Sequence, residues 1–322
     1  MCFIPLISES DPLLNKMLSQ LRILGVKSGQ QQQLVPRRLY KKAKKPLYIS
    51  LHGEVLYGAH PVQMALSARR RNIHCLYYNP DSDRAEQVVD LCKDKGVPCL
   101  KMDRQALTDI CRQADRYKEH HVHQGMVADV SKLYHYPMDY TMPQITQPPP
   151  LIPERHDNSQ HPVWLLLCSI KDPYNLGTII RTAYFLGVER VVVTGPRCDL
   201  TCTVSKASAG TLEVMPVFAV RDAPQLLLAK VEEGWRVLAA AMPGEREDVP
   251  DCAVSSLSLT CPTVLVLGSE GGGIPSEVMS CVTQGVFISP GVCVDRQVDS
   301  LNVSVAAAIV LHKLCSYVES DG

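Results

Sequence analysis

Three short stretches in the second half of this chain combine polar side chains with glycines in a way that could build a ligand site. They are Asp172 to Arg181, Leu267 to Ile274 and Ser300 to Ala306. Each lies beside an apolar run, so its polar residues are expected at strand ends and helix starts, where an α/β sheet forms its ligand crevice. The pattern predicts an enzyme.

The first stretch places Asn175 and Arg181 across a turn from a strand into a helix, with Pro173 and Gly177 shaping the turn. A cation near the positive N-terminal end of a helix is electrostatically unfavourable, which favours a functional role. The alternative is a surface arginine that hydrogen-bonds a carboxylate of a neighbouring loop. This stretch alone does not decide between the two.

The second stretch follows an apolar strand and places Glu270 ahead of three consecutive glycines. Glycines at the carboxyl edge of a sheet let backbone amides approach a ligand closely. The G-x-G-x-x-G fingerprint is absent, so a dinucleotide site is not predicted. Glu270 has no partner nearby in the sequence, which favours a functional turn over a purely structural one.

The third stretch flanks the start of the last helix with Ser300 and Asn302. Either residue could be the N-cap of that helix, a contribution of about 1 kcal/mol. Two capping residues are more than one helix end needs. The spare side chain is therefore predicted to be available for a ligand.

The elements that must position these stretches alternate between apolar strands and helices. Around the first half of the chain, the pattern predicts strands at Ile73 to Tyr77 and Met126 to Val130 and helices at Val62 to Leu66 and Ala85 to Lys93. The second half carries continuous apolar runs separated by helices, which indicates a buried parallel sheet. Its predicted strands are Val163 to Ile170, Arg190 to Val193, Glu213 to Val217, Trp235 to Ala240, Thr263 to Leu267 and Gly285 to Ile288.

A proline-rich interval divides the chain. Six prolines lie between residues 137 and 153 with little periodicity, which indicates an extended linker. We expect a basic leader at 1–47, a small α/β domain at 48–134, the linker at 135–161 and a larger α/β domain at 162–322. The closing helix, Val303 to Tyr317, is apolar almost all round in its first half, so it is expected to pack on the sheet or on a second subunit.

Composition excludes several classes. With 33 basic and 33 acidic residues there is no overall basic excess, so an RNA-binding surface must be a local patch. The 13 cysteines contain no C-x-x-C pair, which favours free thiols over zinc or disulfides. The histidines of Glu119 to His123 lack further ligands at metal spacing, so no metal is predicted. No apolar run approaches the ~20 residues that span a bilayer, so a soluble protein without a membrane partner is expected.

The first fifty residues are basic. They hold nine Lys or Arg against Glu9 and Asp11. An Arg-rich, acid-poor leader is typical of a mitochondrial transit peptide. The alternative is a flexible basic arm that contacts RNA.

In order and spacing, the three stretches resemble the three signature motifs of the SpoU (TrmH) family of RNA 2′-O-ribose methyltransferases, part of the SPOUT superfamily. Ser205 to Gly210 followed by Glu213 to Val217 resembles the family's segment between its first two motifs. Leu56 to Val62 and His123 to Val127 are similar to the start and end of its substrate-binding domain. The resemblance covers about residues 50 to 318.

This resemblance implies an α/β fold: a SPOUT trefoil-knot methyltransferase domain with a parallel sheet, preceded by a smaller L30e-like RNA-binding domain. It implies a homodimer and the cofactor S-adenosyl-L-methionine. The implied catalytic residues are Asn175, Arg181, Glu270, Ser300 and Asn302. The implied cofactor-binding residues are Leu267, Gly268, Ile288, Pro290 and Leu301. The segment from Ile288 to Ser300 is longer than in the family and shifts the proline.

In the implied reaction, a ribose 2′-hydroxyl attacks the sulfonium methyl group in line. Arg181 is the family's proposed base, but a guanidinium resists deprotonation, so we expect it to act as a cation that stabilises the developing alkoxide and grips a phosphate. Glu270 is expected to hold Arg181 or a neighbouring donor in place.

Within the family, the segments around Ser205 and Ser300 are most similar to members that methylate guanosine in mitochondrial large-subunit rRNA. That similarity implies this substrate and a location in the mitochondrial matrix. Two alternatives stay open from the sequence: a tRNA 2′-O-methyltransferase, and a non-catalytic ribosome-assembly factor that binds rRNA.

Overall fold

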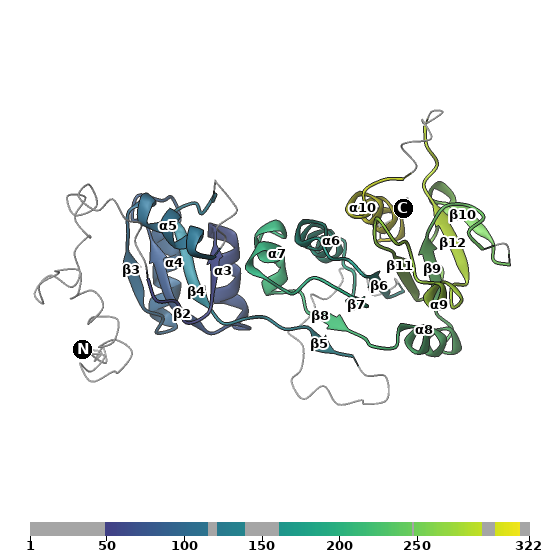
Figure 1. Cartoon of the computed structure of the whole chain (residues 1–322), viewed down its shortest axis with the longest axis horizontal. Coiled ribbons are helices and arrows are strands. Elements are labelled where there is room, and N and C mark those ends of the chain that lie inside the picture. The colour runs from purple at the N-terminus through teal and green to yellow at the C-terminus, as the bar shows by residue number, and fades with distance from the viewer. Residues whose placement is uncertain (1–48, 115–120, 139–160, 247, 292–299, 316–322) are drawn as a thin grey trace, which may run out of the picture.

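The structure is a computed structural model that describes residues 49–114, 121–138, 161–246, 248–291 and 300–315. The predicted leader at 1–47 and most of the predicted linker lie outside these residues. The described chain forms two sheets with their own helices, seen side by side in Figure 1. We call them the N-terminal unit and the C-terminal unit.

The N-terminal unit is a four-stranded sheet in the order β1-β4-β2-β3, with β2 and β3 parallel and the other pairs antiparallel. Helices α3 and α4 pack against one face and α5 against the other, because alternate strand residues point to opposite sides. The elements are β1 (Glu54–Tyr57), α3 (Ala59–Ala68), β2 (Ile73–Tyr78), α4 (Ala85–Asp94), β3 (Cys99–Lys101), α5 (Arg104–Ala114) and β4 (Met126–Val130).

The C-terminal unit is an eight-stranded parallel sheet in the order β10-β12-β9-β11-β6-β7-β8-β5. This confirms the buried parallel sheet expected from the apolar runs. Its strands are β5 (Tyr136–Pro137), β6 (Val163–Cys168), β7 (Arg190–Thr194), β8 (Val217–Ala219), β9 (Arg236–Ala240), β10 (Asp251–Ala253), β11 (Thr263–Leu267) and β12 (Gln284–Phe287).

Helices cover both faces of this sheet. The residues of β6 are buried throughout, and they alternate between the two hydrophobic clusters on either side of the sheet. One face carries α6 (Pro173–Phe185), α7 (Cys202–Ala207) and α10 (Val303–Cys315), and the other carries α8 (Ala223–Glu232) and α9 (Ser276–Met279). Two short 3-10 turns complete the unit, η1 (Thr211–Glu213) and η2 (Val254–Ser256). The closing helix therefore packs on the sheet, as expected.

Two details differ from the expected elements. Glu213 ends the turn η1, and the strand β8 begins only at Val217. The turn forms because Gly210 has φ near 91°, a conformation that glycine adopts readily, and because the Glu213 carboxylate is held by buried partners. The strand β5 lies within the stretch predicted as linker and extends the sheet beside β8. The exact domain limits, the knotted threading and the L30e-like character stay predictions.

Candidate active site

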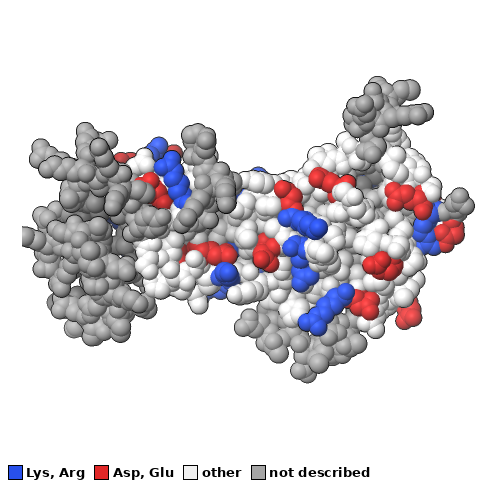
Figure 2. All heavy atoms as spheres, in the orientation of Figure 1, with Lys and Arg blue, Asp and Glu red and all other residues white. Residues whose placement is uncertain are grey.

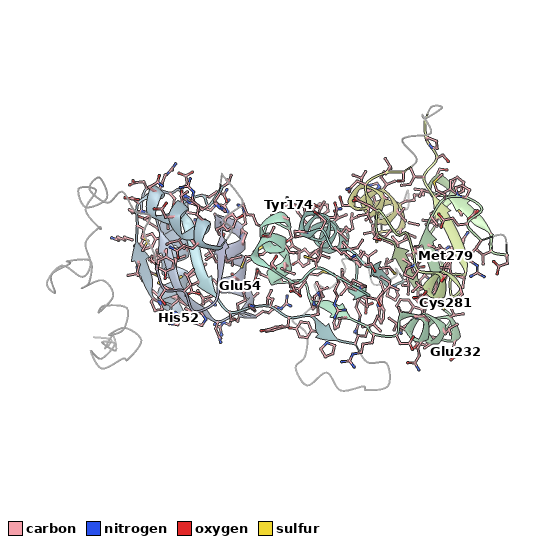
Figure 3. All side chains as sticks on the ribbon, viewed as in Figure 1. His52, Glu54, Tyr174, Glu232, Met279 and Cys281 are labelled. Carbon is pink, nitrogen blue, oxygen red and sulfur yellow. The ribbon has the colours of Figure 1, made fainter. Side chains whose placement is uncertain are left out.

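The start of α6 is fixed by a capping carboxylate. Asp172 Oδ1 accepts hydrogen bonds from the backbone N–H groups of Tyr174 and Asn175, both at 2.8 Å. Pro173 occupies the first helical turn, where its missing N–H has no cost. This arrangement sets the backbone position of Asn175. Figure 3 labels the neighbouring Tyr174 at this end of the helix.

The turn after β11 is closed by backbone hydrogen bonds between Ser269 and Gly273, at 3.1 Å and 2.9 Å. Gly268 lies so close to the returning chain that a Cβ there would be 2.2 Å from the Gly273 carbonyl carbon. A side chain at this position would force the turn open. The glycine thus keeps the tight turn that presents Glu270.

The start of α10 is capped by Asn302. Its Oδ1 accepts from the Ser304 backbone N–H at 2.9 Å and from the Ser304 hydroxyl at 2.7 Å. A side-chain oxygen bonded to the second residue of the helix is the usual N-cap geometry. Capping uses only the oxygen of the Asn302 amide, so its nitrogen is available for another contact.

These three helix and strand ends meet in one polar cluster. Asn302 Nδ2 donates to Glu270 Oε1 at 2.6 Å and to Asn175 Oδ1 at 3.1 Å. Asn175 Nδ2 donates to the same Glu270 oxygen at 3.1 Å. We call Asn175, Glu270 and Asn302 the Asn–Glu–Asn cluster. It brings together one residue from each of the three sequence stretches, and these contacts lie at the exposed surface.

The other two expected catalytic residues lie apart from this contact. Arg181 is exposed on α6, six residues and roughly 9 Å along the helix from Asn175. Among the described residues, no hydrogen bond or ion pair joins Arg181 to Glu270; the carboxylate instead takes the neighbouring donors of Asn175 and Asn302. Ser300 is exposed just before α10.

The residues expected to bind cofactor lie near the ends of β11 and β12 and at the start of α10. Leu267 is buried at the end of β11, and Ile288 packs against the core one residue after β12. Pro290 and Leu301 are exposed. A Cβ added to Gly271 or to Gly273 would meet no atom within 4 Å, so the glycine turn has an open side. Open backbone beside apolar side chains suits a nucleoside, whose base packs on apolar surface and whose polar edges take hydrogen bonds from the backbone.

Sequence reasoning missed two residues of the site, Asp172 and Ser304. Asp172 carried a readable signal, because an aspartate followed by proline ahead of a helix is a start signature. Ser304 carried none, since its role depends on the cap geometry of Asn302.

The molecular surface is mixed in charge on the face that Figure 2 shows. Figure 2 shows Lys and Arg side chains interspersed with Asp and Glu on the face in view, in keeping with the balanced composition. Within the described ranges, no group of three or more His, Cys, Asp or Glu residues could hold a metal ion. No helix in the described part of the chain has the length and apolarity to cross a membrane.

Comparison with known proteins decides the family. Residues 162–312 match the family model of the SpoU rRNA methylase family, and residues 55–136 match the model for RNA 2′-O ribose methyltransferase substrate binding. The human mitochondrial rRNA methyltransferase 1 is 35% identical over 274 residues, covering 82% of this chain and 72% of the relative. The chain belongs to the SpoU rRNA methylase family. It therefore combines a substrate-binding segment with an RNA 2′-O-ribose methyltransferase segment.

Other relatives of this SpoU methylase agree. The fission yeast (Schizosaccharomyces pombe) mitochondrial rRNA methyltransferase 1 is 30% identical, covering 86% of this chain and 96% of the relative. The 23S rRNA (guanosine-2′-O-)-methyltransferase RlmB of Nitrosomonas europaea is 30% identical, covering 81% and 90%. An AdoMet-bound rRNA methyltransferase from Sinorhizobium meliloti shares the fold with a TM-score of 0.58 at 19% identity, covering 96% and 95%.

Proposed function

We propose that this SpoU methylase transfers a methyl group from S-adenosyl-L-methionine to the 2′-hydroxyl of a guanosine ribose in mitochondrial large-subunit rRNA. The observation that carries the proposal is the Asn–Glu–Asn cluster, in which the three motif stretches meet beside the open glycine turn. The guanosine, the rRNA and the mitochondrial setting are supported by the names of the relatives that match most of the chain.

The cofactor would lie against the glycine turn and the start of α10. Backbone groups at Leu267, Gly268 and Ile288 would hold its polar edges, and Leu301 would offer an apolar contact. Pro290, three residues after the end of β12, would border this region. When bound, S-adenosylmethionine supplies a methyl group on a positively charged sulfur.

The residues of the Asn–Glu–Asn cluster would then orient the ribose and accept the proton of its 2′-hydroxyl. Methylation of the 2′-oxygen requires that its hydroxyl proton leave, so a residue of the site must accept that proton. Glu270 is the carboxylate of the cluster, and within the described residues its Oε2 takes no hydrogen bond, so it can accept that proton. Asn175 and Asn302 hold Glu270 in place, and the exposed Ser300, two residues before Asn302, would contact the ribose or the cofactor.

Arg181 serves as a fixed cation in this scheme. Its guanidinium stays charged and is exposed on α6, so it can bind the phosphate next to the target ribose and stabilise negative charge on the 2′-oxygen. A phosphate contact suits an exposed arginine with no protein partner among the described residues.

We assign a homodimer to the outer faces of α6 and α10. These helices pack side by side, and their outer surfaces expose apolar side chains, among them Phe185 at 87% exposure. The others are Tyr174 on α6 and Val305 and Ile309 on α10. Several exposed apolar side chains on two helices that pack together are typical of a subunit interface. Arg181 lies on the same face of α6 as Tyr174 and Phe185, so a partner subunit would border the site.

Residues 1–47 are assigned to import into the mitochondrial matrix. The support is their basic, acid-poor composition together with the mitochondrial names of the relatives. Imaging of fluorescent fusions with and without residues 1–45 tests the assignment. A diffuse signal from the full-length fusion would contradict it.

The deciding experiment incubates the purified full chain with methyl-labelled S-adenosylmethionine and large-subunit rRNA, then maps ribose methylation by nucleotide. We expect one labelled guanosine in rRNA and none in tRNA. Label in tRNA alone would replace the substrate while keeping the chemistry. Absence of both methylation and cofactor binding would refute the proposal.

A further inference from the structure

A buried ion pair joins the two units of the chain. Arg71, which follows α3, donates from Nε to Glu213 Oε2 at 2.7 Å and from Nη2 to Glu213 Oε1 at 3.1 Å. Neither side chain is exposed to solvent. Ser205 of α7 donates to the same carboxylate at 2.6 Å, and Arg71 Nη1 donates to the Ser131 carbonyl at 2.8 Å. Arg71, Ser205 and Glu213 form what we call the interdomain junction.

Further contacts surround the junction. Arg70 donates from Nη1 to the Leu212 carbonyl at 2.8 Å and to the Met215 carbonyl at 3.0 Å. On the other side, Lys206 donates to the Val122 carbonyl at 2.8 Å. Gly210 lies so close to α3 that a Cβ there would be 2.9 Å from the Met64 sulfur. These contacts therefore join the N-terminal unit to the C-terminal unit at several points.

The same segment supports the catalytic helix. Figure 1 shows α7 between α3 of the N-terminal unit and α6 of the C-terminal unit. Gly177 of α6 packs against α7 so tightly that an added Cβ would be 2.5 Å from Ala207 Cβ and 2.8 Å from the Val204 carbonyl oxygen. Asn175 lies two residues before Gly177. A displacement of α7 would therefore shift both the N-terminal unit and α6, the helix that carries Asn175.

We propose that Arg71 and Glu213 are positioning residues that fix the RNA-binding unit at one distance and orientation from the Asn–Glu–Asn cluster, and so determine which ribose reaches it. The proposal rests on the proposed function. Buried ion pairs give specific geometry more reliably than net stability. Two-point hydrogen bonding between a guanidinium and a carboxylate adds the directional constraint that a single contact lacks.

This role depends on how precisely the ribose must be aligned with the methyl donor. In-line methyl transfer needs the 2′-oxygen and the methyl carbon within a narrow geometry, and a misplacement of about 1 Å can cost roughly 100-fold in rate. If the N-terminal unit bound RNA but could rotate relative to the C-terminal unit, several riboses of the RNA could reach the Asn–Glu–Asn cluster. If the N-terminal unit is fixed, only one ribose can reach it.

The test compares full-length wild type with Arg71→Met, Glu213→Leu and the double variant Arg71→Met/Glu213→Leu. Arg71→Met leaves the buried Glu213 carboxylate without its ion-pair partner, and Glu213→Leu leaves the buried Arg71 guanidinium with only the Glu54 carboxylate at 3.4 Å, whereas the double change leaves an apolar contact in place of the Arg71–Glu213 pair. We expect kcat/KM on rRNA to fall about 100-fold in each single variant and to recover in part in the double variant. Affinity for S-adenosylmethionine, measured by calorimetry, should stay within a factor of two or so of wild type in all of them.

Hydrogen exchange supplies a readout independent of catalysis. In the single variants, exchange should rise more at α3 and η1, on both sides of the junction, than in the core strands β6 and β11, which report the global loss of stability. The matched control is the exposed ion pair Asp90–Lys93 on α4, whose side chains are 67% and 69% exposed. Lys93→Met removes one positive charge from the same unit and should leave both readouts as in wild type.

The outcomes separate the two proposals. A wild-type chain that neither binds cofactor nor methylates refutes the proposed function, while exchange still tests the junction. Active single variants with unchanged exchange at α3 and η1 overturn the positioning role. Loss of cofactor binding in all three variants also overturns it, because the pair would then be a general requirement for folding.

Discussion

The Asn–Glu–Asn cluster and the interdomain junction are built from similar parts but differ in burial. Each is a carboxylate held by donors from segments far apart in the sequence: Glu270 lies 95 residues from Asn175, and Glu213 lies 142 residues from Arg71. The first cluster is exposed, whereas the second is fully enclosed between the two units. Figure 3 labels Glu54, which also contacts Arg71, on the N-terminal unit.

Burial decides what each carboxylate does. In the exposed cluster water can replace a lost partner, so the hydrogen bonds orient groups at little cost in folding stability. In the junction neither the Arg71 nor the Glu213 side chain is exposed, so water cannot replace a lost ion-pair partner. We therefore expect changes in the exposed cluster to alter the reaction and changes in the junction to alter stability and geometry.

The largest effect on stability should come from Glu213→Leu. It removes the two-point partner of the buried Arg71 guanidinium and leaves only the Glu54 carboxylate at 3.4 Å, so the free energy of unfolding should fall by about 3 kcal/mol. Chemical denaturation followed by circular dichroism measures it, with the exposed Asp90→Leu as control. A loss no greater than that of the control would remove the distinction between the two clusters.

The next effect concerns the reaction. Glu270→Gln keeps an oxygen that can accept from Asn175 and Asn302 but cannot take a proton. Methylation should fall about 100-fold, the contribution of a positioned proton acceptor. The melting temperature should match that of wild type. Glu277→Gln, an exposed change on α9, is the control for charge loss, and full activity of the Glu270 variant would exclude it as the acceptor.

Gly177→Ala should test whether α7 couples the interdomain junction to the Asn–Glu–Asn cluster. Its new methyl group would meet Ala207 Cβ at 2.5 Å, so α6 and α7 must separate. Overpacking of this kind should cost about 1–2 kcal/mol in unfolding free energy, partly offset by the better helix propensity of alanine. Because α6 also carries Asn175, activity should fall further than the loss of stability explains. Activity that follows stability alone would argue against the link through α7.

The smallest effect on the free energy of unfolding should come from lowering the pH. Burial lowers the pKa of His123, whose Nδ1 accepts from the Gly125 backbone N–H at 3.0 Å. Below about pH 6.5 the unfolded chain binds a proton that folded His123 resists, so its contribution is present at higher pH and lost as pH falls. Unfolding free energy should drop between pH 7.5 and 5.5, with a shallower slope in His123→Asn. Some slope should remain, because burial also lowers the pKa of His135. An unchanged slope would exclude His123 as a contributor.

The fold was largely predictable from the sequence because its signals are local. Continuous apolar runs such as Val163–Cys168 indicate a strand buried on both faces, and the structure confirms the parallel sheet. The strand at Glu213 was misplaced because apolar composition does not reveal that the carboxylate is needed elsewhere. The strand β5 was missed because its two residues form a strand only by pairing with β8.

The candidate site was predictable in its members but not in its contacts. The motif spacing selected Asn175, Glu270 and Asn302, and the structure brings them into hydrogen-bond contact. It did not reveal that Asn302 both caps α10 and holds Glu270, or that Arg181 stands apart on the outer face of α6. These facts depend on where helix ends fall in space.

By itself, then, the sequence determined the element types, the family motifs and the residues capable of chemistry, because periodicity, turn residues and motif spacing act over short distances along the chain. Only the tertiary structure decided which carboxylate is buried and which is exposed to solvent. Glu213 and Glu270 are the same residue type, and the difference arises because packing of α3 against η1 and of β1 against α7 excludes water from Glu213. Burial depends on the whole fold, so no local pattern in the chain specifies it.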